Sequence, residues 1–412
     1  MKIAIVGSGI SGMVAAYLLH SDHDIEVFEA NDYIGGHTHT IDVRCDDKDY
    51  AVDTGFIVFN RVTYPNFCKI IDRLKVDFQP TEMTFSVKCE RTGLEYSPHS
   101  LNTWFIQRKN VFSGSFYRMI FDILRFRREI DHLGTGDEEI EIGCYLKQKG
   151  YSERFIQHFV IPLGSSLWSA DPVRFREFPL STFAKFFKNH GFLEIRNPFQ
   201  WLVIKGGSQK YIDKLTAGYR DRIRLNCAVK SVRRSKEYVE LEFNDQKKCF
   251  EHVVIATHSD QALAMLSDPS PTEKEILGAI PYQRNLTILH TDTSLLPLHR
   301  KIWSSWNYLI PKTETGSAAL TYDMNILQSL SSSDEFCVTL NRPDEIDTDK
   351  WIGQFDYHHP VFDKKTPAAQ KRHQEISGVN RTHYCGAYWG YGFHEDGVNS
   401  ALAACQYFGK RI

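Results

Sequence analysis

The chain has 412 residues, which is long enough for two or three domains with sizeable buried cores. Its 49 Lys and Arg residues nearly balance 51 Asp and Glu residues, so no overall field attracts nucleic acid or an anionic membrane. The nine cysteines include no C-x-x-C pair and no Cys/His group at metal-ligand spacing. Because the first residues also lack the features of an export signal, we expect a cytoplasmic protein that binds neither a metal nor nucleic acid.

A short β-branched run at the start of the chain leads into a glycine-rich turn. Residues 2–6 read Lys-Ile-Ala-Ile-Val, and residues 7–12 read Gly-Ser-Gly-Ile-Ser-Gly. The run predicts a buried parallel strand. In a turn of this pattern Gly7 permits the tight reversal, Gly9 lets the backbone approach a pyrophosphate, and Gly12 lets the next helix pack on the strand. The N-terminus of that helix then faces the phosphates.

A helix at residues 13–19 and a second strand at residues 25–29 complete this unit. The second strand ends in Glu29, an acid at the place where such folds hold the ribose hydroxyls of a dinucleotide. A lone glycine fingerprint is a weak signal, but strand, turn, helix, strand and acid occur here in the required order. The sequence therefore predicts a Rossmann-type α/β domain that binds a dinucleotide.

The residues after Glu29 favour a flavin over a nicotinamide cofactor. Residues 31–37 read Asn-Asp-Tyr-Ile-Gly-Gly-His, and residues 52–56 read Val-Asp-Thr-Gly-Phe. This pair of blocks resembles the flavin amine oxidase and phytoene desaturase superfamily. The resemblance implies FAD as the cofactor, approached by the backbone of the second glycine pair, with residues 52–56 near the flavin ring. No covalent-flavin cysteine motif is evident, so we expect the FAD to be bound non-covalently.

The Rossmann pattern stops near residue 80, and the chain is aromatic and helix-like to about residue 195. A glycine-pair block at residues 201–211 and a buried-type strand at residues 252–256 resemble the superfamily's return to its FAD-binding domain. We predict an α/β fold in which a Rossmann-type FAD-binding domain is interlaced with an α+β substrate (cap) domain. The FAD-binding segments are residues 1–80, 196–269 and 371–412, and the cap segments are residues 81–195 and 270–370.

A small antiparallel layer is expected inside the second FAD-binding segment. Residues alternate with period two at 222–225, 229–232 and 238–243. By the resemblance, the backbone of Val229 contacts the adenine.

The most distinctive segment is the C-terminal block at residues 382–401, which predicts a strand, a glycine-rich turn and a helix. We expect Asp396 as the N-cap and a helix over residues 397–404, whose positive end points at an anion. In the superfamily this end faces the flavin pyrimidine, where it favours the reduced flavin. The run G-A-Y-W-G-Y-G-F-H-E-D-G resembles a subgroup of bacterial NAD/FAD-binding oxidoreductases associated with cyclopropane fatty acid synthases. That resemblance implies a lipid-modifying role and a lipid-synthase partner.

The resemblance also assigns residues to the site. Trp389, Tyr391 and Phe393 are expected as walls beside the flavin ring, and Trp389, Tyr391, His394 and Asn285 are the catalytic candidates, without an assigned role. Many amine oxidases place a lysine near flavin N5, and the best match here puts Asn285 at that position, which disfavours amine oxidation. The implied FAD-binding residues are Gly7, Gly9, Ser11, Gly12, Glu29, Ala30, Gly35, Gly36, His37, Thr54, Gly55, Phe56, Val229, Gly386, Gly397 and Val398.

Two further features leave alternatives open. We interpret residues 358–360, His-His-Pro, as a turn in the cap, and His39 as structural. Residues 116–128 place apolar side chains and four arginines at helical spacing. Such a helix lies on a membrane surface, or it packs into the core with a solvated outer face. A peripheral position at the inner face of the membrane is therefore an open alternative to a purely cytoplasmic one.

The leading hypothesis is an FAD-dependent oxidoreductase in which the aromatic cap holds an apolar substrate, an acyl chain of a lipid, against the flavin. Hydride would pass at flavin N5, while the protein orients the substrate, excludes water and tunes the flavin. Two alternatives remain open: a flavin amine oxidase, and a non-catalytic flavoprotein that supports a lipid-modifying enzyme.

Overall fold

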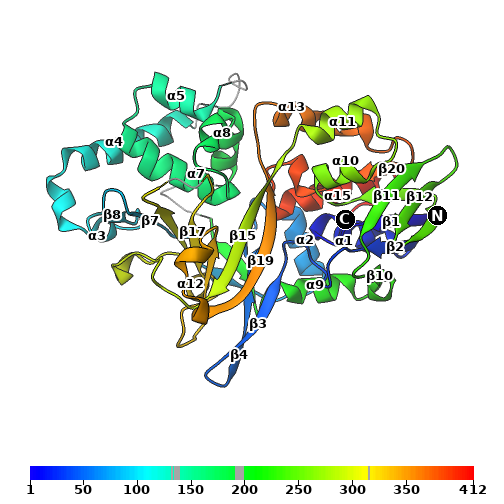
Figure 1. The fold of residues 1–412 in the computed structure, drawn as a ribbon, viewed down its shortest axis with the longest axis horizontal. Helices are drawn as coiled ribbons and strands as arrows, with labels where there is room; N and C mark the ends of the chain where they lie inside the picture. The colour runs from blue at the N-terminus through cyan, green and yellow to red at the C-terminus, as the bar shows by residue number, and fades with distance from the viewer. Residues whose placement is uncertain (131–132, 134–139, 191–198, 314–315) are drawn as a thin grey trace.

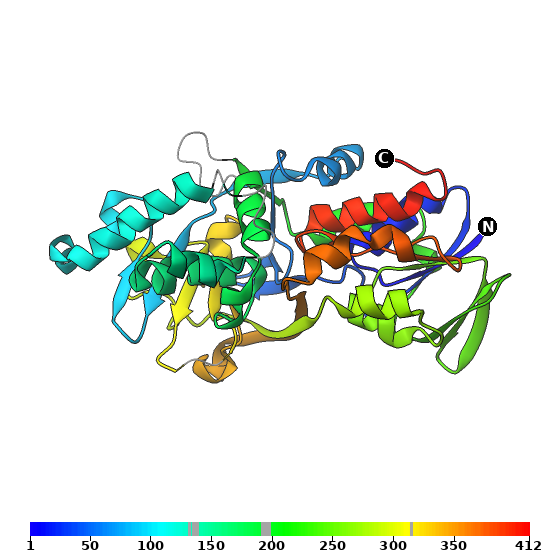
Figure 2. The same cartoon turned by 90° about the horizontal axis from the view of Figure 1, so that it is seen from above.

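The computed structural model describes residues 1–130, 133, 140–190, 199–313 and 316–412. Two lobes lie side by side, and both chain termini lie in the same lobe (Figure 1). The view in Figure 2, turned by 90°, shows the same separation, with the C-terminal helix in the lobe that carries the N-terminus. We call this lobe the FAD lobe, after the cofactor that the sequence predicts for it, and the other lobe the cap.

The FAD lobe is built on a parallel sheet with the strand order β10–β2–β1–β14–β20. Along β1, Ile3 and Ile5 face one side of the sheet, while Ala4 and Val6 face the other. Burial on both faces explains why the run is continuously apolar. The sheet, with helices packed on it, confirms the predicted α/β class. Its strands are β1 (Lys2–Val6), β2 (Asp24–Phe28), β10 (Ile223–Arg224), β14 (His252–Ile255) and β20 (Thr382–Tyr384).

Different layers cover the two faces of this sheet. One face packs against the helices α1 (Ile10–Leu19), α2 (Pro65–Arg73), α9 (Gln209–Thr216) and α15 (His394–Gln406). The other face packs against an antiparallel layer and a group of short helices. These elements are β11 (Val229–Arg234), β12 (Val239–Phe243), β13 (Gln246–Phe250), α10 (Ser259–Met265), α11 (Pro271–Gly278), α13 (Thr366–Lys371) and α14 (His373–Ile376).

The antiparallel layer differs from the prediction in one strand. Residues 229–232 lie in it, and so does the predicted segment 238–243 from Val239 onward, but Ile223–Arg224 forms β10 and pairs in parallel with Val27 and Phe28 of β2. The helix α9, which packs on the sheet just before this strand, delivers the chain to the free edge of β2. A two-residue strand is too short for an alternation of apolar and polar side chains to indicate which sheet the strand joins.

The cap contains a sheet with the strand order β19–β15–β18–β17–β16–β7–β8. Most neighbouring strands are antiparallel, but β16 pairs in parallel with β7. The strands β7 and β16 come from before and after the FAD-lobe strands β10 and β14 in the chain, so two separate segments share one sheet. The exact domain boundaries remain a prediction. The strands are β7 (Phe85–Cys89), β8 (Leu94–Tyr96), β15 (Tyr282–His290), β16 (Trp306–Ile310), β17 (Leu320–Asp323), β18 (Cys337–Leu340) and β19 (Trp351–Pro360).

Helices of the cap cluster against one side of this sheet around an aromatic core (Figure 1). Rings such as Phe183 and Phe187 stack with centroids 4.0 Å apart, and stacked aromatic pairs add to the stability gained by burial. These helices are α3 (Leu101–Trp104), α4 (Gly114–Ile130), α5 (Ile142–Gln148), α6 (Glu153–Phe155), α7 (Ile161–Trp168) and α8 (Leu180–Asn189). The short helix α12 (Met324–Leu327) follows β17.

Two small sheets complete the fold and hold the residue 52–56 block in place. The strand β4 ends at Asp53, a buried acid that accepts hydrogen bonds from Thr40 Oγ1 and from the backbone N–H of Ser208. Burial raises the pKa of Asp53 to about 6, against the opposing effect of these hydrogen bonds. The strands are β3 (Thr40–Cys45) and β4 (Lys48–Asp53) in one sheet, and β5 (Val58–Phe59), β6 (Phe78–Thr81) and β9 (Trp201–Ile204) in the other.

Candidate functional site

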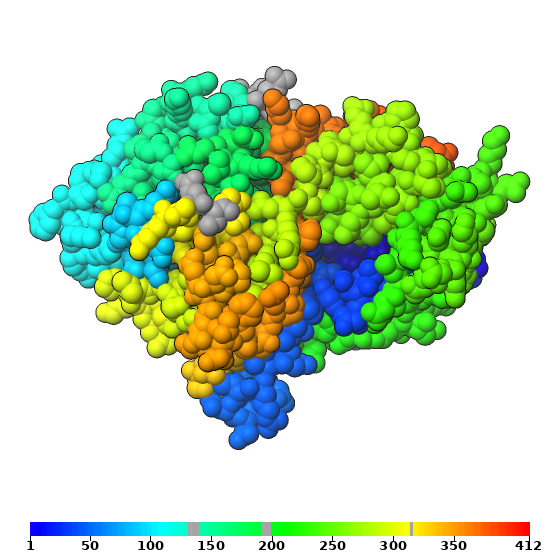
Figure 3. All heavy atoms as spheres, in the orientation of Figure 1, coloured from blue at the N-terminus to red at the C-terminus, as the bar shows by residue number. Residues whose placement is uncertain are grey.

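A cavity of about 790 Å³ lies between the two lobes. The FAD lobe lines it with the first glycine turn, residues 28–37, residues 227–230 and the C-terminal block, and the cap lines it with aromatic side chains. On the face shown in Figure 3, a hollow opens between the orange β19 segment and the green antiparallel layer, with blue N-terminal residues at its floor. Cavities of this size hold single organic ligands or cofactors.

Two glycine turns meet at the floor of the cavity. Gly7 has φ +100° and Gly36 has φ +60°, which is the left-handed region where a side chain causes strain. A Cβ atom on Gly36 would lie 3.0 Å from Cα of Gly9, while a Cβ atom on Gly9 would meet no protein atom within 4 Å. A Cβ atom on Gly12 would lie 1.9 Å from the Gly7 carbonyl oxygen. Gly12 is thus required by packing, whereas the bare side of Gly9 borders open space.

Glu29 is buried and lines the cavity directly after β2. Its Oε2 accepts hydrogen bonds from the Ser8 N–H at 2.8 Å and from Ser8 Oγ at 2.7 Å, and its Oε1 accepts from the Asn31 N–H at 2.9 Å. These bonds fix the carboxylate. Because each carboxylate oxygen accepts more than one hydrogen bond, the group can also receive hydroxyl donors from a ligand.

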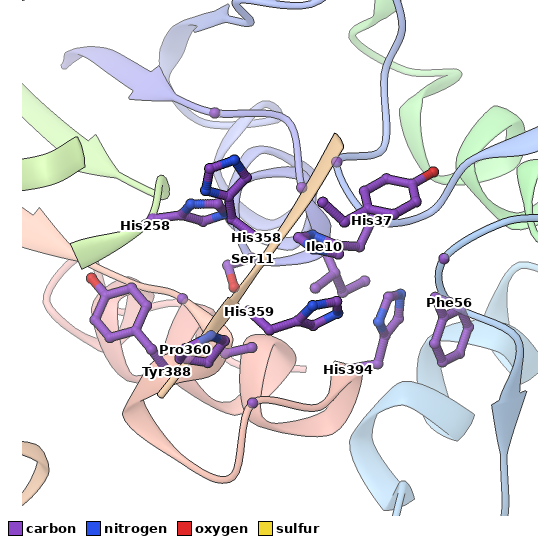
Figure 4. Close-up of a pocket in the computed structure, with 18 of the residues that line it drawn as sticks. Ile10, Ser11, His37, Phe56, His258, His358, His359, Pro360, Tyr388 and His394 are labelled. Carbon is purple, nitrogen blue, oxygen red and sulfur yellow. The ribbon is translucent and has the colours of Figure 1, made fainter. Parts of the chain in front are cut away.

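Six described histidines line the cavity, and apart from His190 they are His37, His258, His358, His359 and His394. In Figure 4 the rings of His37, His359 and His394 lie around one space beside Ile10. Burial lowers the pKa of His37 to about 4 and that of His258 to about 3, and it holds the pKa values of His359 and His394 well below the usual range. The four rings are therefore neutral at pH 7. Among the described residues, no His/Cys/Asp/Glu group is suited to hold a metal ion.

The interpretation of residues 358–360 as a turn is wrong. His358 and His359 lie in β19, where they pair with Arg284 and Gln283 of β15. Pro360 ends the strand, and β19 is an edge strand of its sheet, where proline is tolerated. The signal that could have revealed this strand is the alternation of Trp, Gly, Phe, Tyr and His at every second position from 351 to 359.

A chain of side-chain amides sets the proton position on His359. Asn341 Oδ1 accepts from the backbone N–H of Leu286 at 3.0 Å, and Asn341 Nδ2 donates to the carbonyl oxygen of Ala318 at 3.0 Å. Because these backbone groups have fixed roles, Asn341 Nδ2 must also be the donor to Asn285 Oδ1 at 2.8 Å.

Asn285 then presents its own Nδ2 to His359 Nδ1, 2.9 Å away. His359 Nδ1 must accept this hydrogen bond, so the proton of the neutral ring lies on Nε2. No described residue is hydrogen-bonded to that Nε2–H. His359 lines the cavity, whereas Asn285 is fully buried and is not among the described lining residues.

His394 is held by a second network at the start of α15. Its Nε2 lies 2.9 Å from Tyr211 Oη and 3.1 Å from Thr38 Oγ1. Its ring stacks on Phe56 with centroids 3.4 Å apart and an interplanar angle of 9°, and the two rings face each other in Figure 4. His394 therefore lines the cavity in a fixed orientation.

The C-terminal helix begins earlier than predicted. It starts at His394 with Phe393 as the N-cap, so Asp396 is the third helical residue and not the cap. The Asp396 carboxylate accepts a hydrogen bond from the backbone N–H of Phe393 at 3.0 Å, which is half of a capping box. Burial raises the pKa of Asp396 to about 7. The first turn packs closely on α1, because a Cβ on Gly397 would lie 2.6 Å from Ile10 Cγ2.

The structure brings most of the expected site residues to one cavity. Those that line it are Gly7, Gly9, Ser11, Glu29, Ala30, Gly35, Gly36, His37, Gly55, Phe56, Val229, Gly386, Tyr391 and His394. Those outside the described lining are Gly12, Thr54, Asn285, Trp389, Gly397 and Val398. Trp389 differs from the expected wall position because its ring packs on His373, with centroids 4.2 Å apart.

The cap side of the cavity is aromatic, and part of it was not predicted. Phe393 stacks on Phe186 with centroids 4.8 Å apart, and Trp168 Nε1 donates to the Tyr391 carbonyl oxygen at 3.0 Å. Trp168 and Phe186 were not predicted as cavity walls because they are far from the C-terminal block in the sequence. Only the fold brings α7 and α8 to that block. We call these aromatic side chains of the cavity the aromatic half: Trp168, Phe186, Trp306, Tyr322, Tyr391 and Phe393.

The residues of the FAD lobe fit an FAD molecule. The bare face of Gly9 leaves room for a close approach, and the fixed carboxylate of Glu29 suits ribose hydroxyls. Within the described residues, the buried Nε2 atom of His37 has no hydrogen-bond partner, and a buried polar atom of this kind calls for a ligand or water partner. When bound, FAD supplies the redox chemistry of such a site.

Comparisons with known proteins agree with this fold. Residues 10–291 match the family described as flavin containing amine oxidoreductase. A 1-hydroxycarotenoid 3,4-desaturase from a Flavobacterium species is 35% identical over 96 residues, which cover 23% of this chain and 18% of that protein. The match thus spans less than a fifth of the desaturase.

Solved structures share the fold across nearly the whole chain. A fatty acid isomerase from P. acnes superimposes with a TM-score of 0.70 at 16% identity, covering 98% of both chains. Cyclohexylamine oxidase from Brevibacterium oxydans gives a TM-score of 0.70 at 16% identity over 99% of both chains. A putative protoporphyrinogen oxidase from an Exiguobacterium species gives 0.71 at 14% identity, covering 99% of this chain and 98% of that one.

The fold and the cavity define a two-lobed flavoprotein. The chain belongs to the flavin containing amine oxidoreductase family, and it is an FAD-dependent oxidoreductase. Within the described residues, no helix has both the length and the apolar character needed to span a bilayer.

Proposed function

We propose that this FAD-dependent oxidoreductase acts on a long apolar substrate, an acyl chain of a lipid, which the aromatic half holds against the flavin. The observation that carries this proposal is the composition of the aromatic half. Among the described lining residues, the formally charged side chains are Glu29, Lys230 and Asp356. Glu29 is engaged at the glycine turn, and Asp356 is paired with Arg284 through two contacts of 2.6 and 2.9 Å.

Among the described residues that line the cavity, no carboxylate on the cap side is therefore left to recognise a protonated amine. Apolar carbon instead gains about 0.8 kcal/mol for each methylene removed from water. Two of the compared proteins have names that refer to apolar, chain-like compounds, the carotenoid desaturase and the fatty acid isomerase. These names support the proposed substrate class.

FAD bound at the glycine turns would supply hydride transfer to or from a carbon of the substrate. The aromatic half orients the acyl chain and excludes water. His359 offers a neutral N–H donor to the cavity, and the His394 ring stays fixed by Thr38 and Tyr211. The family resemblance further leads us to propose a partnership with a cyclopropane-type fatty acid synthase.

The test follows flavin absorbance under anaerobic conditions. Phospholipids with unsaturated or cyclopropane acyl chains are added beside a panel of primary amines and polyamines. We expect a change in the flavin spectrum, or reduction of the flavin, with the lipids and not with the amines. This response should be weaker in Trp306→Leu and unchanged in Trp303→Leu. Trp303 is a matched control, since it is a half-buried tryptophan three positions away that lies outside the described lining.

Rapid reduction by amines, with lipids inert, would refute the lipid proposal. It would favour the amine oxidase alternative, which the similarity of the fold to cyclohexylamine oxidase supports.

A further inference from the structure

The helices α3 and α4 lie at the outer end of the cap, away from the FAD lobe (Figures 1 and 2), and this end carries several exposed apolar side chains. It is formed by α3, by the 3₁₀ helix η1 (Arg108–Phe112) and by one side of α4, and we call it the α4 outer face. Large side chains on it are strongly exposed. Their exposed fractions are 80% for Leu101, 40% for Val111, 92% for Phe112, 40% for Tyr117, 66% for Phe121 and 40% for Leu124.

The helix α4 carries two apolar stripes. The buried stripe contains Phe116, Met119, Ile123, Phe126 and Ile130 and packs into the core of the cap. The exposed stripe contains Tyr117, Phe121 and Leu124, spaced at i, i+4 and i+7. A surface helix of a globular protein normally carries polar residues on its outer side. The outer side of α4 is therefore not the solvated polar face of an ordinary packed helix.

The segment that forms this face is rich in basic residues. Residues 99–130 include six Lys and Arg residues and two acidic residues, although the whole chain has a net charge of −2. The two acids are already engaged: Asp122 is buried against Arg118, and Glu129 pairs with Arg125 at 2.7 Å. Within the described part of the chain, no acidic side chain pairs with Arg108, Lys109 or Arg128.

We infer that the α4 outer face docks the protein on an anionic lipid bilayer. A helix with exposed aromatic and leucine side chains beside basic residues is suited to the interface between headgroups and acyl chains. Anionic headgroups attract each nearby Lys or Arg. These apolar side chains are exposed and lie on elements at the end of the molecule (Figure 1), so they can enter a bilayer surface without a rearrangement of the fold. This inference does not depend on the proposed substrate.

The experiment measures co-sedimentation of the full-length, FAD-loaded protein with lipid vesicles. One set contains phosphatidylcholine alone, and in the other about a third of the lipid is phosphatidylglycerol, an anionic lipid. We expect the protein to sediment with the anionic vesicles. Binding should fall as salt rises from about 0.05 M to about 0.5 M, because salt screens the charge contribution.

Variants then separate the two contributions. Phe112→Ser combined with Phe121→Ser should weaken binding to anionic vesicles at least tenfold, and Lys109→Glu combined with Arg128→Glu should remove the preference for them. Val62→Ser is the matched control, because Val62 is 61% exposed but lies in the FAD lobe. All these side chains are outside the core, so unfolding midpoints should stay unchanged.

Three outcomes would overturn the inference. The first is wild-type protein that binds neither vesicle, and the second is a double phenylalanine variant that binds as well as the wild type. The third is a wild-type dimer in solution that the phenylalanine substitutions dissociate while vesicle binding is absent. That third result would assign the face to a copy of the same chain.

Discussion

Replacement of Gly9 by alanine should separate cofactor binding from folding. The backbone at Gly9 has φ −66° and ψ 177°, which alanine adopts without strain, and the added methyl group would meet no protein atom within 4 Å. The methyl group would instead occupy the space beside the second glycine turn, where the fold leaves the backbone bare for a pyrophosphate. The matched control is Gly12→Ala, whose methyl group would clash with the Gly7 carbonyl oxygen at 1.9 Å.

The magnitudes follow from these two environments. For Gly9→Ala, a weaker N-cap costs about 0.5 to 1 kcal/mol, and the loss of chain entropy in the unfolded state returns about 0.4 to 1 kcal/mol. The free energy of unfolding of the FAD-free protein should therefore change by less than about 1 kcal/mol. A hundredfold weaker Kd corresponds to about 2.7 kcal/mol of binding free energy. FAD at 100 times the wild-type Kd should thus stabilise the wild type by about 2.7 kcal/mol and the variant by only about 0.4 kcal/mol.

The assay is thermal or urea unfolding of each protein with and without FAD, together with calorimetric titration of FAD. Gly9→Ala should unfold like the wild type without FAD but gain little stability with it, whereas Gly12→Ala should lose stability in both conditions. A Gly9→Ala variant that binds FAD as tightly as the wild type would refute the assignment of this bare backbone to the cofactor.

Three other substitutions test single side chains. Glu29→Ala should weaken FAD binding by about tenfold to a hundredfold, since a hydrogen bond to a charged group contributes roughly 1.5 to 3 kcal/mol, and calorimetric titration would show an unchanged Kd if another residue holds the ribose. Asn285→Asp should place a proton on His359 Nδ1, because a carboxylate only accepts hydrogen bonds; ¹⁵N NMR of labelled histidine checks this, with His359→Gln assigning the signal. Burial raises the pKa of Asp396 from 3.8 in the unfolded chain to about 7, so its contribution to stability is present below pH 4 and lost as the pH rises to 7. In urea unfolding, the free energy of unfolding of Asp396→Asn minus that of the wild type should therefore rise by on the order of 2 to 4 kcal/mol between pH 4.5 and pH 8. A difference that does not depend on pH would contradict this.

The sequence predicts those parts of the fold that depend on local patterns. The predicted positions agree with the structure for the strand at residues 2–6, the turn up to Gly12 and the acid at Glu29. They could be predicted because burial on both faces of a parallel sheet requires apolar residues and a tight glycine turn requires glycine. No residue pattern indicates the pairing of Ile223–Arg224 with β2. It depends on where α9 delivers the chain, which is a property of the assembled lobe.

The site shows the same division. Glycines of the two turns that line the cavity, such as Gly7 and Gly36, can be predicted because their positive φ angles and close neighbours leave no room for a side chain. Trp168 and Phe186 could not be predicted as cavity walls, because an aromatic residue in a helix is as often part of a core. In this protein they are part of both, since they pack in the aromatic core of the cap and also line the cavity.

Asn285 is a catalytic candidate from the sequence that does not line the cavity but contacts a residue that does, His359. The position was singled out because amine oxidases of the superfamily place a lysine there, and lysine is long enough to reach a ligand. Asparagine is shorter, and Asn285 is buried between Asn341 and His359. Its amide transmits the fixed polarity of two backbone groups to His359, which is the residue that lines the cavity. The group offered to a ligand is thereby a neutral imidazole N–H and not an ammonium. A neutral donor does not repel a cationic amine as a lysine would, so this exchange alone does not select the substrate, and the discrimination between acyl chains and amines rests on the aromatic half of the cavity.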